Sequence, residues 1–295
     1  MKLDRVVLAP KLTALEYDTH RYNRTQVEML SIYRSRNVDA ERILASHERQ
    51  KACLAAVARL FPRAHVVHRN QLSKEATGDA DLVIALGGDN HFTYVAHYAE
   101  APILGLNSDP VGSEGVLLGF SSTGLDGLVR ALESDAVDVE EWPRIRTTLD
   151  GRVIEPAITE CFFGERESAF ASYNLLTLDG SETTHRGSGT LVVNGAGSTG
   201  WYLSAARYRG GQPFKRTERV LRVLAREPSP HAKHNRITEL TVRDGEVARI
   251  VSNNDTHGVV ACDSLAEFRY DFPPGTVAEV SLDTAVTRVV RPKAS

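Results

Sequence analysis

The chain has 295 residues, of which 42% are hydrophobic and 25% charged, a balance typical of a soluble globular protein with one large or two ordinary domains. Its net charge of -3 argues against electrostatic binding of nucleic acid. No apolar run reaches the roughly 18 residues that a membrane span needs, and the N-terminus carries no signal-peptide pattern. Three scattered cysteines without a C-x-x-C pair favour a reduced, cytoplasmic protein.

Residues 1–125 alternate strand and helix signals, which predicts an α/β domain. Helices are expected over 38–61, where Pro62 ends the pattern, and from 92 to about 100. The apolar runs are continuous instead of alternating, as in parallel strands that are buried on both faces. Strands are therefore predicted at 6–8, 66–67, 82–86 and 103–106.

Residues 126–295 predict a mostly antiparallel β domain, with a tail that could return to the first domain. Asp-Gly pairs at 150–151, 179–180 and 244–245 are good hairpin signals between strand-like runs. The runs themselves are short and alternate apolar with polar residues. They cover 144–149, 172–178, 191–193, 239–242 and 277–282.

The most informative loop is Gly87-Gly88-Asp89-Asn90, which follows the apolar run at 82–86. Ligands of open α/β sheets bind at the carboxyl ends of strands, and two glycines let a phosphate approach backbone N–H groups. Asp89 would repel a phosphate, but it suits a general base for an acceptor hydroxyl or a magnesium contact. The alternative is a tight strand-to-helix turn without function.

Residues 83–90 resemble the Gly-Gly-Asp-Gly signature shared by NAD kinases, diacylglycerol kinases and phosphofructokinases. The flanking segments 11–17, 103–110 and 113–115 resemble NAD kinases of the mitochondrial branch. This resemblance implies an N-terminal α/β domain, a β-rich second domain and a site between them. It also implies phosphoryl transfer from ATP, with Mg²⁺, to a ribose hydroxyl of NAD or NADH.

Carried over residue by residue, the resemblance makes Asp89 the catalytic base. Asn90 replaces the last signature glycine, and asparagine tolerates the left-handed backbone that a glycine there would allow. His91 replaces the usual threonine and is either a new phosphate contact or an exposed residue. The resemblance assigns nucleotide binding in this domain to Gly87, Gly88, Asn90, His91 and Asn107.

In the second domain, residues 159–160 resemble the family's Asn-Glu segment and 194–201 its Thr-Pro-Thr-Gly-Ser-Thr-Ala-Tyr segment. Ser188 stands where many bacterial relatives have an acid, and Asp263 resembles an Asp-Gly turn whose role could be structural. The dinucleotide is therefore assigned to Thr159, Glu160, Ser188, Gly197, Ser198, Thr199, Trp201 and Asp263.

Several other hypotheses stay open. Glycines 195, 197 and 200 spell the G-x-G-x-x-G of a dehydrogenase, but hairpin signals surround them. His231 and His234 could bind a metal, although nearby prolines favour a loop, so no protein metal site is predicted. A kinase of the same superfamily with another acceptor and a non-catalytic NAD sensor are the competing functions. The expected partners are small-molecule substrates, without nucleic acid or membrane, and a second copy in a homodimer or higher homo-oligomer.

Overall fold

The computed structural model describes residues 1–134, 136–167, 171–230 and 234–293. The chain forms two compact units, unit 1 with residues 1–140 and 288–295 and unit 2 with residues 141–287. This division lies beyond the predicted boundary at 125 because α6 (Leu128–Glu133) buries Leu128 and Leu132 in the core of unit 1. The chain passes between the units in β6 (Val137–Leu149) and β17 (Val277–Pro292).

Unit 1 is built on a parallel sheet in the order β2-β1-β3-β4, and the end of β17 joins it beside β4. Val289 and Val290 of β17 pair in parallel with the start of β4, so the tail belongs to this unit. The predicted parallel α/β sheet is confirmed. Its strands are β1 (Val6–Pro10), β2 (His65–Val66), β3 (Leu82–Gly87), β4 (Ile103–Asn107) and β5 (Phe120–Ser121).

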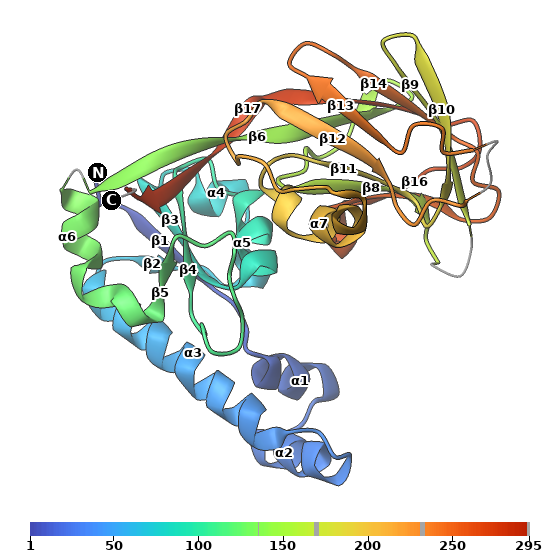
Figure 1. Cartoon of the computed structure of the whole chain (residues 1–295). Coiled ribbons are helices and arrows are strands. Elements are labelled where there is room, and N and C mark those ends of the chain that lie inside the picture. The colour runs from blue at the N-terminus through green and yellow to red at the C-terminus, as the bar shows by residue number, and fades with distance from the viewer. Residues whose placement is uncertain (135, 168–170, 231–233, 294–295) are drawn as a thin grey trace. The chain divides into compact units, whose positions relative to one another are not determined.

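The long helix α3 (Ala40–Leu60) contributes residues to two hydrophobic cores. Its C-terminal half packs Val57 on the sheet, whereas Ile43 in its N-terminal half packs with α1 (Ala14–Tyr22) and α2 (Gln26–Ser35). Figure 1 shows α1 and α2 at the N-terminal end of α3. The other helical segments of unit 1 are η1 (Arg69–Gln71), α4 (Lys74–Thr77), α5 (Asp89–Ala96) and η2 (Ser122–Gly127).

Both α1 and α2 start at capping boxes that the hydrophobic pattern does not reveal. Thr13 accepts a hydrogen bond from the Glu16 N–H (3.1 Å), and the Glu16 carboxylate accepts one from the Thr13 N–H (2.9 Å). Thr25 and Glu28 repeat the arrangement for α2. Each box satisfies two N–H groups that a helix start otherwise leaves without partners.

Unit 2 is a sandwich of two antiparallel sheets, in the orders β10-β9-β14-β17 and β13-β12-β11-β8-β15-β16. Leu176 and Ile250 of the first sheet share one core with Phe163 and Val192 of the second. The predicted antiparallel β fold is thereby confirmed. Its further elements are β7 (Arg152–Val153), β8 (Glu160–Glu165), β9 (Ser172–Leu178), β10 (Ser181–Gly187), β11 (Thr190–Val193), η3 (Gly197–Thr199), α7 (Trp201–Ala206), η4 (Arg207–Arg209), β12 (Val220–Ala225), β13 (Glu239–Arg243), β14 (Ala248–Ser252), β15 (Gly258–Cys262), η5 (Ala266–Phe268) and β16 (Arg269–Asp271).

Two of the three Asp-Gly hairpin predictions are confirmed by backbone conformation. The third is wrong, because Asp244 and Gly245 connect β13 to β14, which pair with different strands in different sheets. Asp179 and Gly180 join β9 to β10 with φ values of 47° and 73°, and Asp150 and Gly151 join β6 to β7 with 48° and 80°. Two successive residues with positive φ give the turn whose twist matches that of the flanking strands. These two hairpins are therefore fixed locally.

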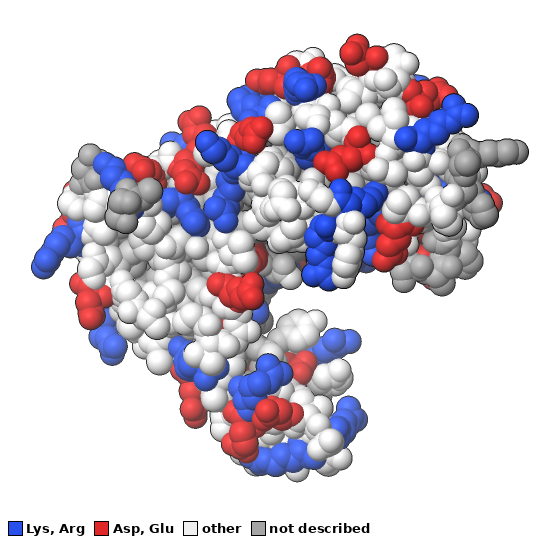
Figure 2. Space-filling view, viewed as in Figure 1, with Lys and Arg blue, Asp and Glu red and all other residues white. Residues whose placement is uncertain are grey.

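The surface carries charges of both signs. Figure 2 shows Lys and Arg side chains interspersed with Asp and Glu over the face in view. Within the described part of the chain, no helix combines the length and the apolarity needed to span a bilayer.

Candidate active site

The Gly-Gly-Asp loop lies where the carboxyl ends of β1, β3 and β4 meet. The Lys11 N–H, just after β1, donates to the Leu86 carbonyl (2.8 Å), and the Ser108 N–H, just after β4, donates to the Gly87 carbonyl (3.3 Å). A Cβ atom on Gly87 would lie 3.0 Å from side-chain atoms of both His91 and Lys11. A side chain at 87 would therefore crowd both neighbours, and the exposed Lys11 is a neighbour of the loop that the motif itself did not identify.

Asp89 is the first residue of α5, and its carboxylate is held by the loop that follows β4. Its Oδ1 accepts a hydrogen bond from the Leu117 N–H (2.8 Å) and its Oδ2 one from the Val116 N–H (3.0 Å). Each carboxylate oxygen can accept a second bond. The geometry therefore orients Asp89 and still leaves each oxygen able to take a proton or contact a cation.

Asn90 does not need the left-handed backbone that the signature suggested. It lies in the first turn of α5 and has no positive φ, and Gly88 before it has a φ of -113°. Its side chain is exposed beside the helix start. The replacement of glycine by asparagine at 90 is thus accommodated by an ordinary helical turn.

His91 is neither a phosphate contact nor an exposed residue, so that prediction is wrong. Only 2% of its surface is exposed, and its Nε2 lies 2.8 Å from the Ala9 carbonyl oxygen on β1. Burial lowers the pKa of His91 to about 4, with smaller effects from the nearby Arg69 and Lys11 charges. A neutral imidazole thus fills the space between α5 and β1.

The loop after β4, residues 107–117, is organised by two buried side chains. Asn107 accepts a hydrogen bond from the Asp109 N–H (3.1 Å) and donates one to the Ser113 carbonyl (2.8 Å). Gly115 has a φ of +63°, and a Cβ atom there would lie 2.6 Å from the Asn107 amide nitrogen. The predicted nucleotide contact Asn107 therefore uses its side chain to shape this loop.

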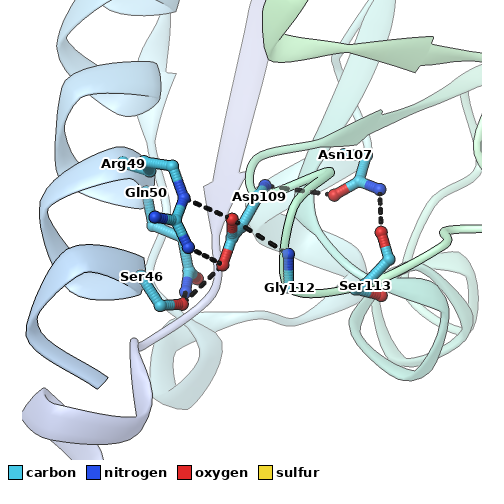
Figure 3. Close-up of polar contacts among 7 residues, drawn as sticks. All are labelled: Ser46, Arg49, Gln50, Asn107, Asp109, Gly112 and Ser113. Atoms are coloured by element: carbon cyan, nitrogen blue, oxygen red, sulfur yellow. Dashed lines mark hydrogen bonds and ion pairs between the residues drawn. The ribbon is translucent and has the colours of Figure 1, made fainter. Parts of the chain in front are cut away.

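Helix α3 holds the same loop through Asp109, as Figure 3 shows. The Arg49 guanidinium donates from Nε to Oδ1 (2.7 Å) and from Nη2 to Oδ2 (3.3 Å), and the Ser46 hydroxyl donates to Oδ2 (2.5 Å). Burial alone would raise the pKa of Asp109, but Arg49 and Ser46 hold it below its ordinary value. Sequence reasoning missed this contact because its partners are 60 residues apart.

In unit 2, Asp263 is buried and hydrogen-bonded to the chain before β8, which favours the structural role over the predicted contact with a dinucleotide. Its buried carboxylate accepts hydrogen bonds from the N–H groups of Ile158 (2.8 Å), Thr159 (2.7 Å) and Glu160 (3.1 Å). The Thr159 hydroxyl also donates to it (2.6 Å). Asp263 and Ser264 both have positive φ and form a tight turn. This turn fixes the start of β8, and both the N–H and the hydroxyl of Thr159 are used in hydrogen bonds to Asp263.

Glu160 is the second acid of this region, and unlike Asp263 it keeps surface that a ligand could contact. It is half-buried, and its Oε1 accepts a hydrogen bond from the Ser264 hydroxyl (3.1 Å). Desolvation, and secondly repulsion by the Asp263 carboxylate, raise the pKa of Glu160 to about 7. An acid that titrates near neutral pH can accept or donate a hydrogen bond, so it is suited to a ribose hydroxyl or an amide.

The loop at 194–201 needs glycine for close packing. A Cβ atom on Gly197 would lie 2.3 Å from the Thr159 carbonyl oxygen, and one on Gly195 would lie 2.0 Å from the Lys215 carbonyl oxygen. The predicted contact Ser198 is fully buried, and its hydroxyl donates to the Gly195 carbonyl (2.7 Å). The same hydroxyl accepts a hydrogen bond from the Phe214 N–H (3.1 Å), so Ser198 ties this loop to the segment around Phe214. Because β11 and β12 around the loop pair antiparallel, a βαβ dehydrogenase unit is excluded.

Besides Glu160, three of the predicted residues of unit 2 keep accessible surface, namely Ser188, Thr199 and Trp201. Thr199 borders an open cleft of about 740 Å³ together with Phe214, Lys215 and Arg216. Trp201 stacks on Phe162 at 5.6 Å between ring centroids, and the Arg226 guanidinium lies 4.4 Å from its ring.

Ser188 lies near the same arginine. Its hydroxyl donates to the Glu227 carboxylate, and its carbonyl accepts from Arg226 (3.4 Å). Phe162 and Arg226 are thus neighbours of the predicted site that the motifs did not identify.

No protein metal site is formed by the described residues, among which no three His, Cys, Asp or Glu side chains cluster as metal ligands. His231 lies outside the described residues, so the pair His231 and His234 has no structural description. Cys53, Cys161 and Cys262 are buried free thiols.

Comparison with known proteins gives a consistent result. A probable NADH kinase of Oryza sativa subsp. japonica is 26% identical over 77% of this chain and 75% of its own length. An NAD kinase of Halobacterium salinarum is 33% identical, and the match spans 43% of this chain and about half (47%) of that kinase. No family model matches the chain.

Solved structures extend the similarity to the full chain. An NAD kinase from Archaeoglobus fulgidus in complex with ATP aligns over 98% of this chain and 93% of its own, with a TM-score of 0.65 and 19% identity. Yeast NADH kinase complexed with NADH aligns over 99% and 84%, with a TM-score of 0.71 and 15% identity. The parallel α/β unit and the β-sandwich unit described above therefore form a fold shared with these kinases. By sequence the chain is similar to NAD kinases and NADH kinases, and by fold it is similar to solved members of the same kinases.

Proposed function

We propose that this protein transfers the γ-phosphoryl group of ATP to a ribose hydroxyl of NAD or NADH, giving NADP(H) and ADP. The observation that carries the proposal is the geometry of Asp89, whose carboxylate is oriented by the Val116 and Leu117 N–H groups at the carboxyl ends of parallel strands. Asp89 would accept the proton of the ribose hydroxyl while the hydroxyl oxygen attacks the γ-phosphorus.

The triphosphate would lie at the Gly87-Gly88 loop, where the exposed Lys11 adds a positive charge. We propose that Mg²⁺ arrives with ATP, because Mg²⁺ is commonly held by substrate phosphates and one or two carboxylates. Asp89 fits this role, since each of its oxygens accepts one hydrogen bond from the described residues and can take a further contact. The ion would neutralise charge on the phosphates.

The dinucleotide would be bound by residues of unit 2 that stay accessible. Glu160 would bond a ribose or amide group, and the Trp201 ring, stiffened by Phe162 and Arg226, would cover a planar base. Gly197, Ser198, Thr159 and Asp263 would shape this surface without contacting the ligand through their side chains.

A coupled assay tests the function. Purified protein is incubated with Mg²⁺, with ATP or polyphosphate, and with NAD or NADH, and NADP(H) is measured. We expect Asp89→Asn to lower kcat by about 10²–10⁴-fold, whereas Asp126→Asn, at an exposed acid of the same unit, keeps wild-type turnover. Binding of NAD without any NADP(H) would refute the proposal and favour another acceptor or a sensor.

The alternative of a non-catalytic NAD sensor depends on Asn90 and His91, which replace the last glycine of the signature and the threonine after it. Asn90 lies in a regular helical turn and His91 in the core, so neither disturbs Asp89. We also propose a cytoplasmic homodimer or higher homo-oligomer. Size-exclusion chromatography with light scattering tests the oligomer, since a single-chain mass at micromolar concentration would contradict it.

A further inference from the structure

Helix α3 contacts the 107–117 loop, which orients Asp89, through an ion pair between Arg49 and Asp109. Arg49 and Ser46 lie one turn apart on α3 and both contact the Asp109 carboxylate, and Gln50 donates to the Ser46 hydroxyl at 3.1 Å (Figure 3). The Asp109 side chain is 8% exposed and that of Arg49 is 35% exposed. A carboxylate this buried needs its charged partner, so the pair fixes the loop against the helix.

From Asp109 the contact continues to Asp89. The Gly112 N–H donates to Asp109 Oδ1 (3.2 Å), and Asn107 closes the loop by bonding Asp109 N–H and the Ser113 carbonyl. The chain then turns at Gly115, and the next two residues present their N–H groups to the Asp89 carboxylate. A shift of residues 107–115 would therefore move the donors that orient Asp89.

We propose that Arg49 is a positioning residue for Asp89, which it orients through Asp109 and the 107–117 loop. The inference rests on the proposed kinase function for its effect on turnover, but the structural link stands independently of turnover. Among the described residues, the Arg49 guanidinium bonds Asp109 and not Asp89 or the glycine loop. Its replacement should therefore reduce the chemical step and leave substrate binding nearly unchanged.

The test uses three variants of the full chain. Arg49→Ala removes the guanidinium, and Arg49→Lys keeps the charge but cannot form the two-pronged contact. Arg59→Ala is the matched control, because Arg59 is an exposed arginine on the same helix. Kinetics give kcat and KM for each substrate, and hydrogen exchange followed by mass spectrometry reports on residues 107–118.

For Arg49→Ala we expect a drop in kcat on the order of 10²-fold with KM near wild type, because small misplacements of a catalytic group cost about this much. The amides of Val116 and Leu117 should exchange on the order of tenfold faster. Arg49→Lys should recover part of both losses. Arg59→Ala should match wild type.

The two readouts separate the inference from the proposed function. If Arg49→Ala and Arg59→Ala have the same hydrogen-exchange rates over residues 107–118 and the same kcat, the positioning role of Arg49 is wrong. If the wild-type chain makes no NADP(H), the proposed function fails, and the exchange rates alone still decide whether Arg49 holds the loop of Asp89. If Arg49→Ala does not fold, Ser46→Ala removes one donor to Asp109 and gives the same comparison with a smaller expected effect.

Discussion

The titration of Glu160 makes a direct prediction about stability. Its folded pKa of about 7 lies above its ordinary value of 4.5, so the folded state disfavours the charged carboxylate. Below about pH 4.5 Glu160 is protonated in both the folded and the unfolded protein, and it does not lower the free energy of unfolding. As the pH rises through 7, the charged carboxylate increasingly destabilises the folded protein. The two values differ by an amount worth about 3 kcal/mol at most.

Glu160→Gln removes this penalty and keeps an oxygen for the Ser264 hydroxyl. Because Glu160 retains some contact with water, we expect the variant to be more stable than wild type by about 1–3 kcal/mol at pH 8, and equal to it near pH 4.5. Urea unfolding followed by tryptophan fluorescence measures this, since both tryptophans, Trp142 and Trp201, lie in unit 2. The control Glu182→Gln changes an exposed acid of β10.

Two results would refute the conclusion that the Glu160 charge destabilises the folded protein. If Glu160→Gln had the same effect at pH 4.5 and pH 8, its stability change would come from packing and not from charge. If it were less stable at pH 8, the carboxylate would have a favourable partner in the folded protein. Either outcome would also weaken Glu160 as an acid that can both donate and accept near neutral pH.

Three further predictions concern buried groups. Burial lowers the pKa of His91 and of His185 to about 4, so both should stay neutral at pH 5.5 in imidazole ¹⁵N NMR, and stability should fall as the pH drops from 6.5 toward 4; a charged ring at pH 5.5 would contradict this. Gly197→Ala should cost about 1–3 kcal/mol in calorimetric unfolding, whereas Gly127→Ala, with nothing within 4 Å of the new Cβ atom, should not. Asp263→Asn should cost about 3 kcal/mol or more; wild-type stability with lost NAD binding would instead assign Asp263 to the ligand.

Much of the fold follows from local sequence. Continuous apolar runs mark the parallel strands, and two of the three Asp-Gly pairs mark hairpins, because both signals depend on neighbouring residues only. The pair Asp244-Gly245 shows the limit of the local signal, because the strands on either side of it pair in different sheets. The helices α1 and α2 could also have been predicted from Thr13 with Glu16 and Thr25 with Glu28, since a capping box is a local pattern. The motif order likewise placed Asp89 at the end of a buried strand.

The tertiary structure decided which predicted residues have free functional groups. His91 contacts Ala9, 82 residues away, and Asp263 contacts Thr159, 104 residues away. Arg49, which no motif indicated, lies 60 residues from its partner Asp109. Local sequence determines where polar side chains occur along the chain, whereas contacts between distant segments determine which of them are already hydrogen-bonded and which can still bind a ligand.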